Sequence, residues 1–264
     1  MVVLHVKRGD DHVFLYETSV NTDTDTVIRE LVSVFNGRLK VQRICMEMEE
    51  LAEHGTMLPE QMRQLNDDQI EELHLKDEWA DKCIPMGGFT FNKDPLCRRN
   101  GQQPNEAMRK VLEKAMADAK AMIDKNLCKT NTVLTLKIVE EALNILRGAV
   151  MIVYPMKLPP HDTIQMEFIN MEDLTGTQAS KEVIEPSKAQ LWFAGHQVLP
   201  GKQLKDYLGS NDKTKVVVKL NQLGEGPPGR EQVVNEQLRR QMMAANFKRQ
   251  EELRVSVNYV RLIE

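Results

Sequence analysis

If this protein carried a catalytic nucleophile, a cysteine thiol would be the first candidate. The chain has Cys45, Cys83, Cys97 and Cys128, and Cys83, which lies close to Pro85, is the candidate nucleophile. A reactive thiol needs a base close to it in space. An inert buried or loop thiol is the simpler interpretation of Cys83, so we predict no catalytic residue.

A metal or phosphate site is not predicted either. His74, Cys83 and Cys97 come nearest to a zinc set, but they are scattered and lack the clustered Cys-x-x-Cys pairs that zinc sites use. Gly87-Gly88 is not followed by the Lys-Ser/Thr of a phosphate-binding loop and predicts a turn before a strand at 89–91. We therefore expect no cofactor, no metal and no small-molecule substrate.

Paired charges in the sequence are explained most simply as solvated helix faces. Glu49-Glu50 and Glu140-Glu141 are of this kind, and the basic pairs Arg98-Arg99 and Arg239-Arg240 are not interleaved with aromatic residues. The 264 residues carry 35 basic and 39 acidic side chains, a net charge of −4. This balance gives no overall attraction to nucleic acid or to an anionic membrane, and we expect neither as a partner.

The sequence also lacks the signals of a secreted or membrane-spanning protein. No apolar run approaches the roughly 18 residues that a spanning helix needs. Lys7 and Arg8 interrupt the apolar N-terminus, which is not typical of a secretory signal. Widely spaced cysteines in a chain of this size are typical of reduced thiols. These features predict a cytoplasmic protein.

The first half of the chain predicts a hairpin followed by helices. Alternating β-formers predict strands at 2–7 and 12–18 around a turn at Arg8–Asp11, and Thr24 can cap a helix that stops at Gly37. The remaining expected elements are helices at 40–53 and 59–82, a break at 83–104, a strongly amphipathic helix at 104–123 and a helix from Thr132 to Gly148. The last two helices are expected to pair as a hairpin.

After Gly148 the pattern changes to short β-like runs. We expect strands at 150–154, 164–168, 190–194, 196–199 and 215–220, a Gly/Pro linker at 224–229 and a last helix at 230–254. The predicted fold class is α+β. The predicted parts are 1–55 (hairpin plus helices), 56–148 (helical), 149–222 (a β-grasp domain) and 230–254 (C-terminal helix).

The β-grasp prediction depends on LWFAGHQVLPGKQLKDYL at 191–208, which resembles the third and fourth strands of ubiquitin. Leu191 and Phe193 are two residues apart on one strand and so share the core face. Gly195 permits the positive φ of a tight turn. Leu204 is expected to fill the core under the following loop, and the Tyr207 hydroxyl to bind nearby backbone.

Residues 1–36 also look like the first half of a β-grasp fold, which leaves two arrangements open. They form either a separate element or one interrupted domain with the C-terminal strands. The apparently complete strand set after residue 150 favours separation. No diglycine tail follows Leu220, so conjugation to other proteins is not expected.

A built-in ubiquitin-like domain is typically a docking surface. Trp192 alternates away from Leu191 and Phe193 and corresponds to the outward apolar binding position of that family. We predict that Trp192, together with His196 and Val218, contacts a partner. The alternative is that Trp192 packs against the helical region of its own chain.

Three further stretches of sequence resemble one protein family, and the resemblance extends over nearly the whole chain. VVLHVKRGDDHVFLYE, MGGFTFNKDPLCRRNGQQPNEAM and RGAVMIVYPMKLPPHD resemble the kurly-type cilia- and flagella-associated proteins. The resemblance implies a non-enzymatic factor of the cytoplasm and the cilium basal body. It also implies roles in ciliary motility, outer dynein arm assembly and the orientation of cilia (planar cell polarity). The implied partners are other dynein-arm assembly factors, including a zinc-finger MYND-domain protein, and axonemal dynein chains.

Two other functions stay open from the residues alone. One is a structural component of the axoneme or basal body, and the other is an enzyme that uses Cys83. The stretch RVSVNYVRLIE at 254–264 changes from charged helix to β-like sequence. The resembled family is expected to continue into a longer acidic tail, so this stretch is interpreted as a variant C-terminus.

Overall fold

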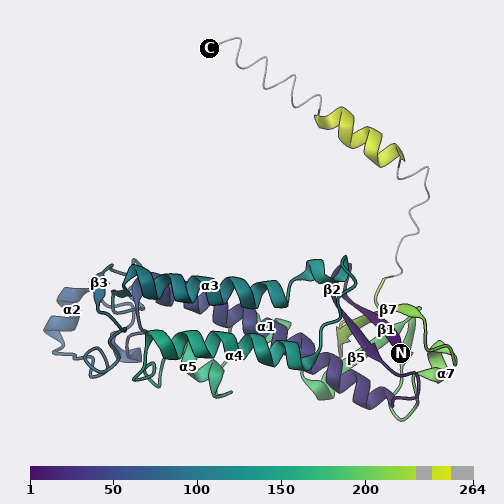
Figure 1. Ribbon diagram of the computed structural model, residues 1–264, viewed down its shortest axis with the longest axis horizontal. Coiled ribbons are helices and arrows are strands. Elements are labelled where there is room, and N and C mark those ends of the chain that lie inside the picture. The colour runs from purple at the N-terminus through teal and green to yellow at the C-terminus, as the bar shows by residue number, and fades with distance from the viewer. Residues whose placement is uncertain (230–239, 251–264) are drawn as a thin grey trace. The chain divides into compact units, whose positions relative to one another are not determined.

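A computed structural model describes residues 1–229 and 240–250 of the chain. Met1–Pro228 form one compact unit, and Gly229–Glu264 form a second unit, in which residues 240–250 are helical (Figure 1). The predicted C-terminal helix at 230–254 is therefore seen in part. The predicted variant stretch at 254–264 lies outside the described residues.

A five-stranded mixed sheet lies at one end of the first unit. Its strands are β1 (Val2–Arg8), β2 (Asp11–Thr18), β5 (Ala189–Phe193), β6 (His196–Val198) and β7 (Lys215–Gln222), in the order β2-β1-β7-β5-β6. β1 and β7 are parallel in the centre, and the other neighbours are antiparallel. Helix α1 (Thr24–His54) packs on one face. Two hairpins around a central parallel pair, with a helix over one face, are the expected β-grasp layout, and the α+β class is confirmed.

The preferred prediction that residues 1–36 are separate from the C-terminal strands is wrong. β1 pairs directly with β7, with Val6 opposite Val218, so one interrupted sheet uses both ends of the first unit. Their apolar faces meet under α1, where Leu4, Leu31 and Leu191 are fully buried. Because neither hairpin can bury its apolar face alone, the two complete one core.

The first two strands expected at 150–154 and 164–168 are helical in the structure. Residues 150–153 continue α4 (Leu136–Val153), where Ala149, Val150 and Val153 extend the buried stripe of Ala142 and Leu146. Residues 164–168 belong to α5 (Thr163–Phe168), whose N-terminus is capped by Asp162. A short run of apolar residues does not distinguish strand from helix by periodicity.

Gly37 does not end a helix, and α1 is continuous over 31 residues. A Cβ on Gly37 would lie 2.7 Å from Cγ1 of Val139 in α4. The glycine therefore lets the two helices approach closely. The prediction of two helices at this place is wrong, because Gly37 serves the close packing of α1 against α4 and does not end a helix.

Helices α3 (Glu106–Met122) and α4 pack on each other and on α1, as Figure 1 shows. The expected hairpin of these two helices is confirmed, with the 3-10 turn η2 (Lys125–Cys128) in the connection. Asn105 caps α3 and Thr135 caps α4. Leu112, Met116 and Leu146 are buried in the three-helix core.

Residues 55–104 form the end of the unit away from the sheet. The long helix expected at 59–82 is wrong, because only η1 (Glu60–Met62) and α2 (Asp67–Glu72) are helical. The break at 83–104 and the strand at 89–91 are confirmed, since β3 (Phe89–Phe91) pairs with β4 (Gln102–Pro104). The other short elements of the unit are α6 (Gln178–Glu182), η3 (Pro186–Lys188) and α7 (Lys205–Leu208).

A buried arginine attaches this irregular end to α1 and α5. The Arg99 guanidinium donates to Gly55 O at 2.9 Å and to Glu47 Oε2 at 2.7 Å, and it lies 3.7 Å from Asp162 Oδ2. Asp162 in turn accepts from the backbone N–H of Met57 and of Ile164. Burial raises the pKa of Asp162, and the positive charge of Arg99 partly offsets this rise. These contacts join residues 55–57 and 99 to α1 and to the start of α5.

Candidate partner-binding surfaces

A tight turn joins β5 and β6 within the segment 191–208. Phe193 pairs with His196 across a two-residue turn in which Ala194 and Gly195 both have positive φ, 49° and 83°. Two-residue turns of this hand match the twist of the strands they join. Gly195 adopts this conformation without cost, whereas Ala194 carries a steric penalty.

The four predicted structural side chains converge on the core beneath this hairpin. Leu191 and Leu204 are buried, and Phe193 and Tyr207 pack half-buried against the core cluster. The Tyr207 hydroxyl accepts a hydrogen bond from the Leu199 N–H at 2.9 Å. It therefore holds the loop after β6, which has no ladder partner there.

The same loop is attached to the start of α1. Thr24 donates from Oγ1 to Leu199 O, and Asp25 Oδ2 accepts from the Gly201 N–H, both at 2.9 Å. Leu204 N–H donates to Thr22 O. Residues 199–204 and 22–25 thus form one hydrogen-bonded unit, which ties the C-terminal hairpin to the N-terminal one.

The three predicted partner contacts do not share a face of the sheet. Trp192 lies opposite Gln197 and Lys219 and faces away from α1. Val218 lies opposite Phe193 on the core face and is only 2% exposed, so its prediction as a contact residue is wrong. His196 is exposed but pairs with Phe193, on the side opposite Trp192. Side chains alternate along a strand, so a shift by one residue reverses the face.

The face that carries Trp192 also holds residues that the sequence did not single out. Val217 is 39% exposed there. On β1 and β2, His5 Nε2 and His12 Nδ1 are 2.8 Å apart, and one donates to the other. The Trp192 indole Nε1 is buried and has no hydrogen-bond partner in the described chain. Strand register alone reveals this set, because its members come from four strands.

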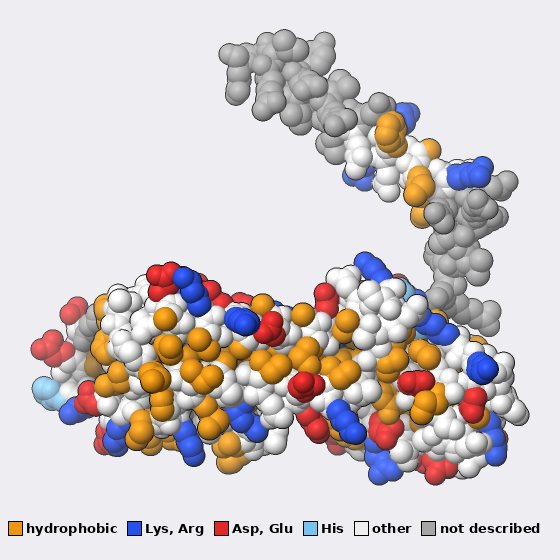
Figure 2. Space-filling view, in the orientation of Figure 1, with side chains coloured by type: hydrophobic (Ala, Val, Ile, Leu, Met, Phe, Trp, Pro, Cys, Tyr) orange, Lys and Arg blue, Asp and Glu red, His pale blue; other side chains and the backbone are white. Residues whose placement is uncertain are grey.

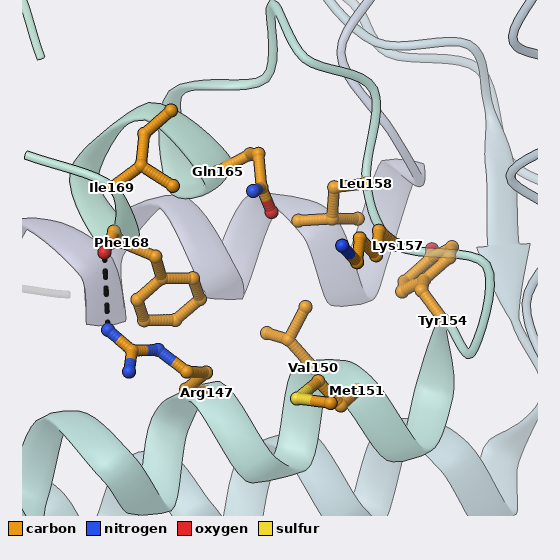
Figure 3. Close-up of a pocket in the computed structure, with 9 residues that line it drawn as sticks. All are labelled: Arg147, Val150, Met151, Tyr154, Lys157, Leu158, Gln165, Phe168 and Ile169. Atoms are coloured by element: carbon orange, nitrogen blue, oxygen red, sulfur yellow. Dashed lines mark hydrogen bonds between the residues drawn. The ribbon is translucent and has the colours of Figure 1, made fainter. Parts of the chain in front are cut away.

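A second candidate surface lies between α4 and α5, on helices that precede the strands of residues 189–222. It is a hollow of about 320 Å³ shown in Figure 3. Nine residues line it: Arg147, Val150, Met151, Tyr154, Lys157, Leu158, Gln165, Phe168 and Ile169. Arg147 donates to Phe168 O at 3.2 Å and lies over the Phe168 ring, 5.4 Å from its centroid. We call this surface the α4–α5 groove.

The environment of Cys83, the candidate nucleophile of the alternative enzyme hypothesis, disfavours a thiolate. Cys83 is buried, and burial, followed by the Asp77 and Asp162 carboxylates, raises the pKa of its thiol. A raised pKa suppresses the reactive thiolate. No group of three or more His, Cys, Asp or Glu side chains that could hold a metal is found in residues 1–229 and 240–250. Over the same residues, no helix has the length and apolarity to cross a bilayer.

Comparison with known proteins identifies the relatives of this chain. Residues 189–258 match the family model described as "Cilia- and flagella-associated protein 298". A protein of that name from Drosophila melanogaster is 73% identical over 254 residues, covering 96% of this chain and 87% of the relative. The Homo sapiens and Danio rerio proteins are 54% and 55% identical, each covering 89% of this chain and 81% of the relative. No solved structure matches the chain. At this identity and coverage, the chain belongs to the cilia- and flagella-associated protein 298 family.

Proposed function

We propose that this chain is a non-enzymatic protein-binding factor in the cytoplasmic assembly of outer dynein arms, with a further role in positioning cilia. Membership of a cilia- and flagella-associated family carries the proposal. The proposed sites of action are the cytoplasm and the basal body. The proposed partners are other assembly factors, including a zinc-finger MYND-domain protein, and axonemal dynein chains.

The sheet face that carries Trp192 is the proposed docking surface, by analogy with ubiquitin-like domains. Trp192 presents a half-buried ring and a buried indole N–H without an acceptor in the described chain. Tryptophan is enriched among the residues that dominate binding energy, and the half-buried ring is the part of Trp192 that a partner can contact. Val217 extends the apolar surface on the neighbouring strand.

Affinity purification of the tagged full chain from the cytosol of ciliated cells tests the proposal. We expect dynein-arm assembly factors or dynein chains among the captured proteins. Purification that returns neither of them contradicts the proposal. Salt extraction of isolated axonemes separates it from a structural role, because an assembly factor is expected chiefly in the soluble pool.

Trp192→Ala tests the surface, with His196→Ala as the matched control on the opposite face. We expect Trp192→Ala to lower capture of the partner by about tenfold or more, the effect of losing ≥ ~1.4 kcal/mol. His196→Ala is expected to leave it unchanged. Equal capture by both variants would exclude the Trp192 face while leaving the assembly role intact.

A further inference from the structure

We propose that the α4–α5 groove binds an amphipathic helix of a partner protein whose apolar stripe is bordered by acidic side chains. This inference deepens the proposed binding role and rests on it. The groove lies on the helices, not on the sheet, so it adds a second surface beside the one that carries Trp192.

The floor and the surroundings of the groove are apolar. Val150, Leu158 and Phe168 contribute to the floor, and Figure 3 shows Val150 and Leu158 facing each other across it. Of the lining residues, Met151 is 59% exposed and Ile169 is 49% exposed. Hydrophobic side chains gather along the helical part of the first unit in Figure 2. Contiguous exposed apolar surface of this kind marks binding sites, and methionine adapts to a bound helix.

The charges at the groove select the partner. Arg147 and Lys157 stand on opposite sides of the apolar side chains in Figure 3, and both are exposed. In the described part of the chain, Arg147 contacts Phe168 and neither Arg147 nor Lys157 makes an ion pair. The groove lining contains no acidic residue. An apolar ridge with a carboxylate toward each end therefore complements this surface, because opposite charges across an interface set its specificity.

The size and openness of the hollow favour a helix over a small metabolite. About 320 Å³ is at the lower limit for ligand pockets, and no carboxylate, histidine or cysteine lines it. A helix that lays residues i, i+3 and i+4 into an apolar groove is a common mode of recognition. Arg147 is already oriented by its contacts with Phe168, so it loses little freedom on binding.

Residues 240–250, the described part of the chain's own C-terminal region, lack the required acidic charge. Residues 240–250 expose Met242, Met243 and Phe247 but carry Arg240, Lys248 and Arg249 and no acidic residue. Like charges across an interface weaken binding. The same argument disfavours this helix from a second copy. Glu236, Glu251 and Glu252 flank residues 240–250 in the sequence, so the cross-linking test below decides whether this segment is the occupant.

Two synthetic helical peptides test the inference against the full chain. Both carry one apolar stripe of Leu and Phe, bordered by Glu in the first peptide and by Lys in the second. We expect the Glu peptide to bind the chain at least about tenfold more tightly, with a preference that weakens in high salt. Equal binding, or tighter binding of the Lys peptide, overturns the inference.

A charge swap makes the test sharper. Arg147→Glu combined with Lys157→Glu is expected to reverse the preference, whereas Lys114→Glu combined with Lys137→Glu makes the same charge change on exposed positions away from the groove and is expected to preserve it. Met151→Ser, which removes apolar surface without adding charge, is expected to weaken both peptides. Unchanged circular dichroism verifies that each variant is folded. A preference that survives the groove swap overturns the inference.

A photo-crosslinking residue at Met151 of the full chain in ciliated cells then identifies the occupant. Cross-links to a partner segment with an apolar stripe and flanking Asp or Glu support the inference. Cross-links only to residues 240–250, to a second copy or to lipid overturn it. If the peptides bind as expected but no dynein-arm factor is purified, the groove stands and the proposed function fails.

Discussion

The two ends of helix α1 are stabilised in different ways. At its N-terminal end, the sheet closes over apolar side chains, among them Leu4, Leu191 and Leu220, which are fully buried. At its C-terminal end, residues 55–104 leave Phe89 and Phe91 exposed and are held by Arg99 and by backbone hydrogen bonds to carboxylates. The sheet end is therefore expected to respond chiefly to changes in side-chain volume. The opposite end is expected to respond to changes in charge.

The largest effect is expected from Arg99→Met. The change leaves the fully buried Asp162 without its cation, and breaking a buried pair in this way costs about 3–5 kcal/mol. Denaturant unfolding and hydrogen exchange of residues 55–104 measure the loss. Arg98→Ala, at a partly exposed position, is the control, with an expected change within about 0.5 kcal/mol. Addition of Asp162→Asn is expected to restore part of the stability, and a loss as small as the control's would contradict the buried-pair argument.

Leu191→Ala makes the complementary change at the sheet end. Removing a fully buried leucine leaves a cavity and is expected to cost about 2–4 kcal/mol. The midpoint of global unfolding measures this loss, while hydrogen exchange at 94–101 reports the opposite end. Val217→Ala on the exposed face of the neighbouring strand is the control, with a change within about 0.5 kcal/mol. Equal losses in the two variants would show that the predicted core is not where the stability lies.

Low pH is expected to destabilise residues 94–101 at the C-terminal end of α1 before it destabilises the sheet end. Burial by itself raises the pKa of Asp94, but hydrogen bonds from the Leu96, Arg98 and Arg99 N–H groups more than offset it, so the pKa is lowered overall. A carboxyl whose pKa is lower in the folded state stabilises that state above its unfolded pKa of about 3.9, and the contribution is lost as the pH falls further. Hydrogen exchange is expected to increase at 94–101 before it does in β1 and β7.

Asp94→Asn provides the control for this acid effect. We expect weaker protection of residues 94–101 at neutral pH, by roughly 1–3 kcal/mol, because the amide has one acceptor oxygen fewer. Protection should then depend less on pH between about 5 and 2. A variant that keeps the full pH dependence would assign the effect to another carboxylate.

The smallest expected effect concerns the turn at Ala194. Ala194→Asn is expected to stabilise the sheet by about 0.5–1 kcal/mol, because Asn tolerates the positive φ of 49° better than Ala does. Gly195→Ala is the matched change in the opposite direction, at a φ of 83°. Thermal unfolding measures both. A loss of stability in Ala194→Asn would contradict the assignment of strain to this residue.

Much of the sheet could be predicted because its signals are local. The spacing of Leu191 and Phe193 and the glycine at 195 predicted the β5–β6 hairpin, and the same reasoning gave the hairpin at the N-terminus. The family resemblance likewise depended on contiguous stretches, and the relatives confirm it. The dynein-arm role and the named partners stay predictions.

The candidate surfaces were less predictable because they depend on register and on packing. Val218 was assigned to the partner face, but its pairing with Phe193 places it in the core. The α4–α5 groove was missed, because Met166 and Phe168 were interpreted as a strand, whereas they belong to a helix capped by Asp162. Arg147 and Lys157 could be recognised as candidate binding residues only once the fold placed them beside the apolar floor of the groove.

The sequence by itself determined part of the local conformation: the two hairpins of the sheet, the glycine turn at 195 and the apolar stripes of α3 and α4. Only the tertiary structure decided that β1 lies beside β7, that Gly37 is a contact with Val139 and that residues 150–153 continue a helix. The physical reason is that backbone conformation follows from neighbouring residues, whereas pairing and burial depend on apolar surfaces from distant segments that must cover one another.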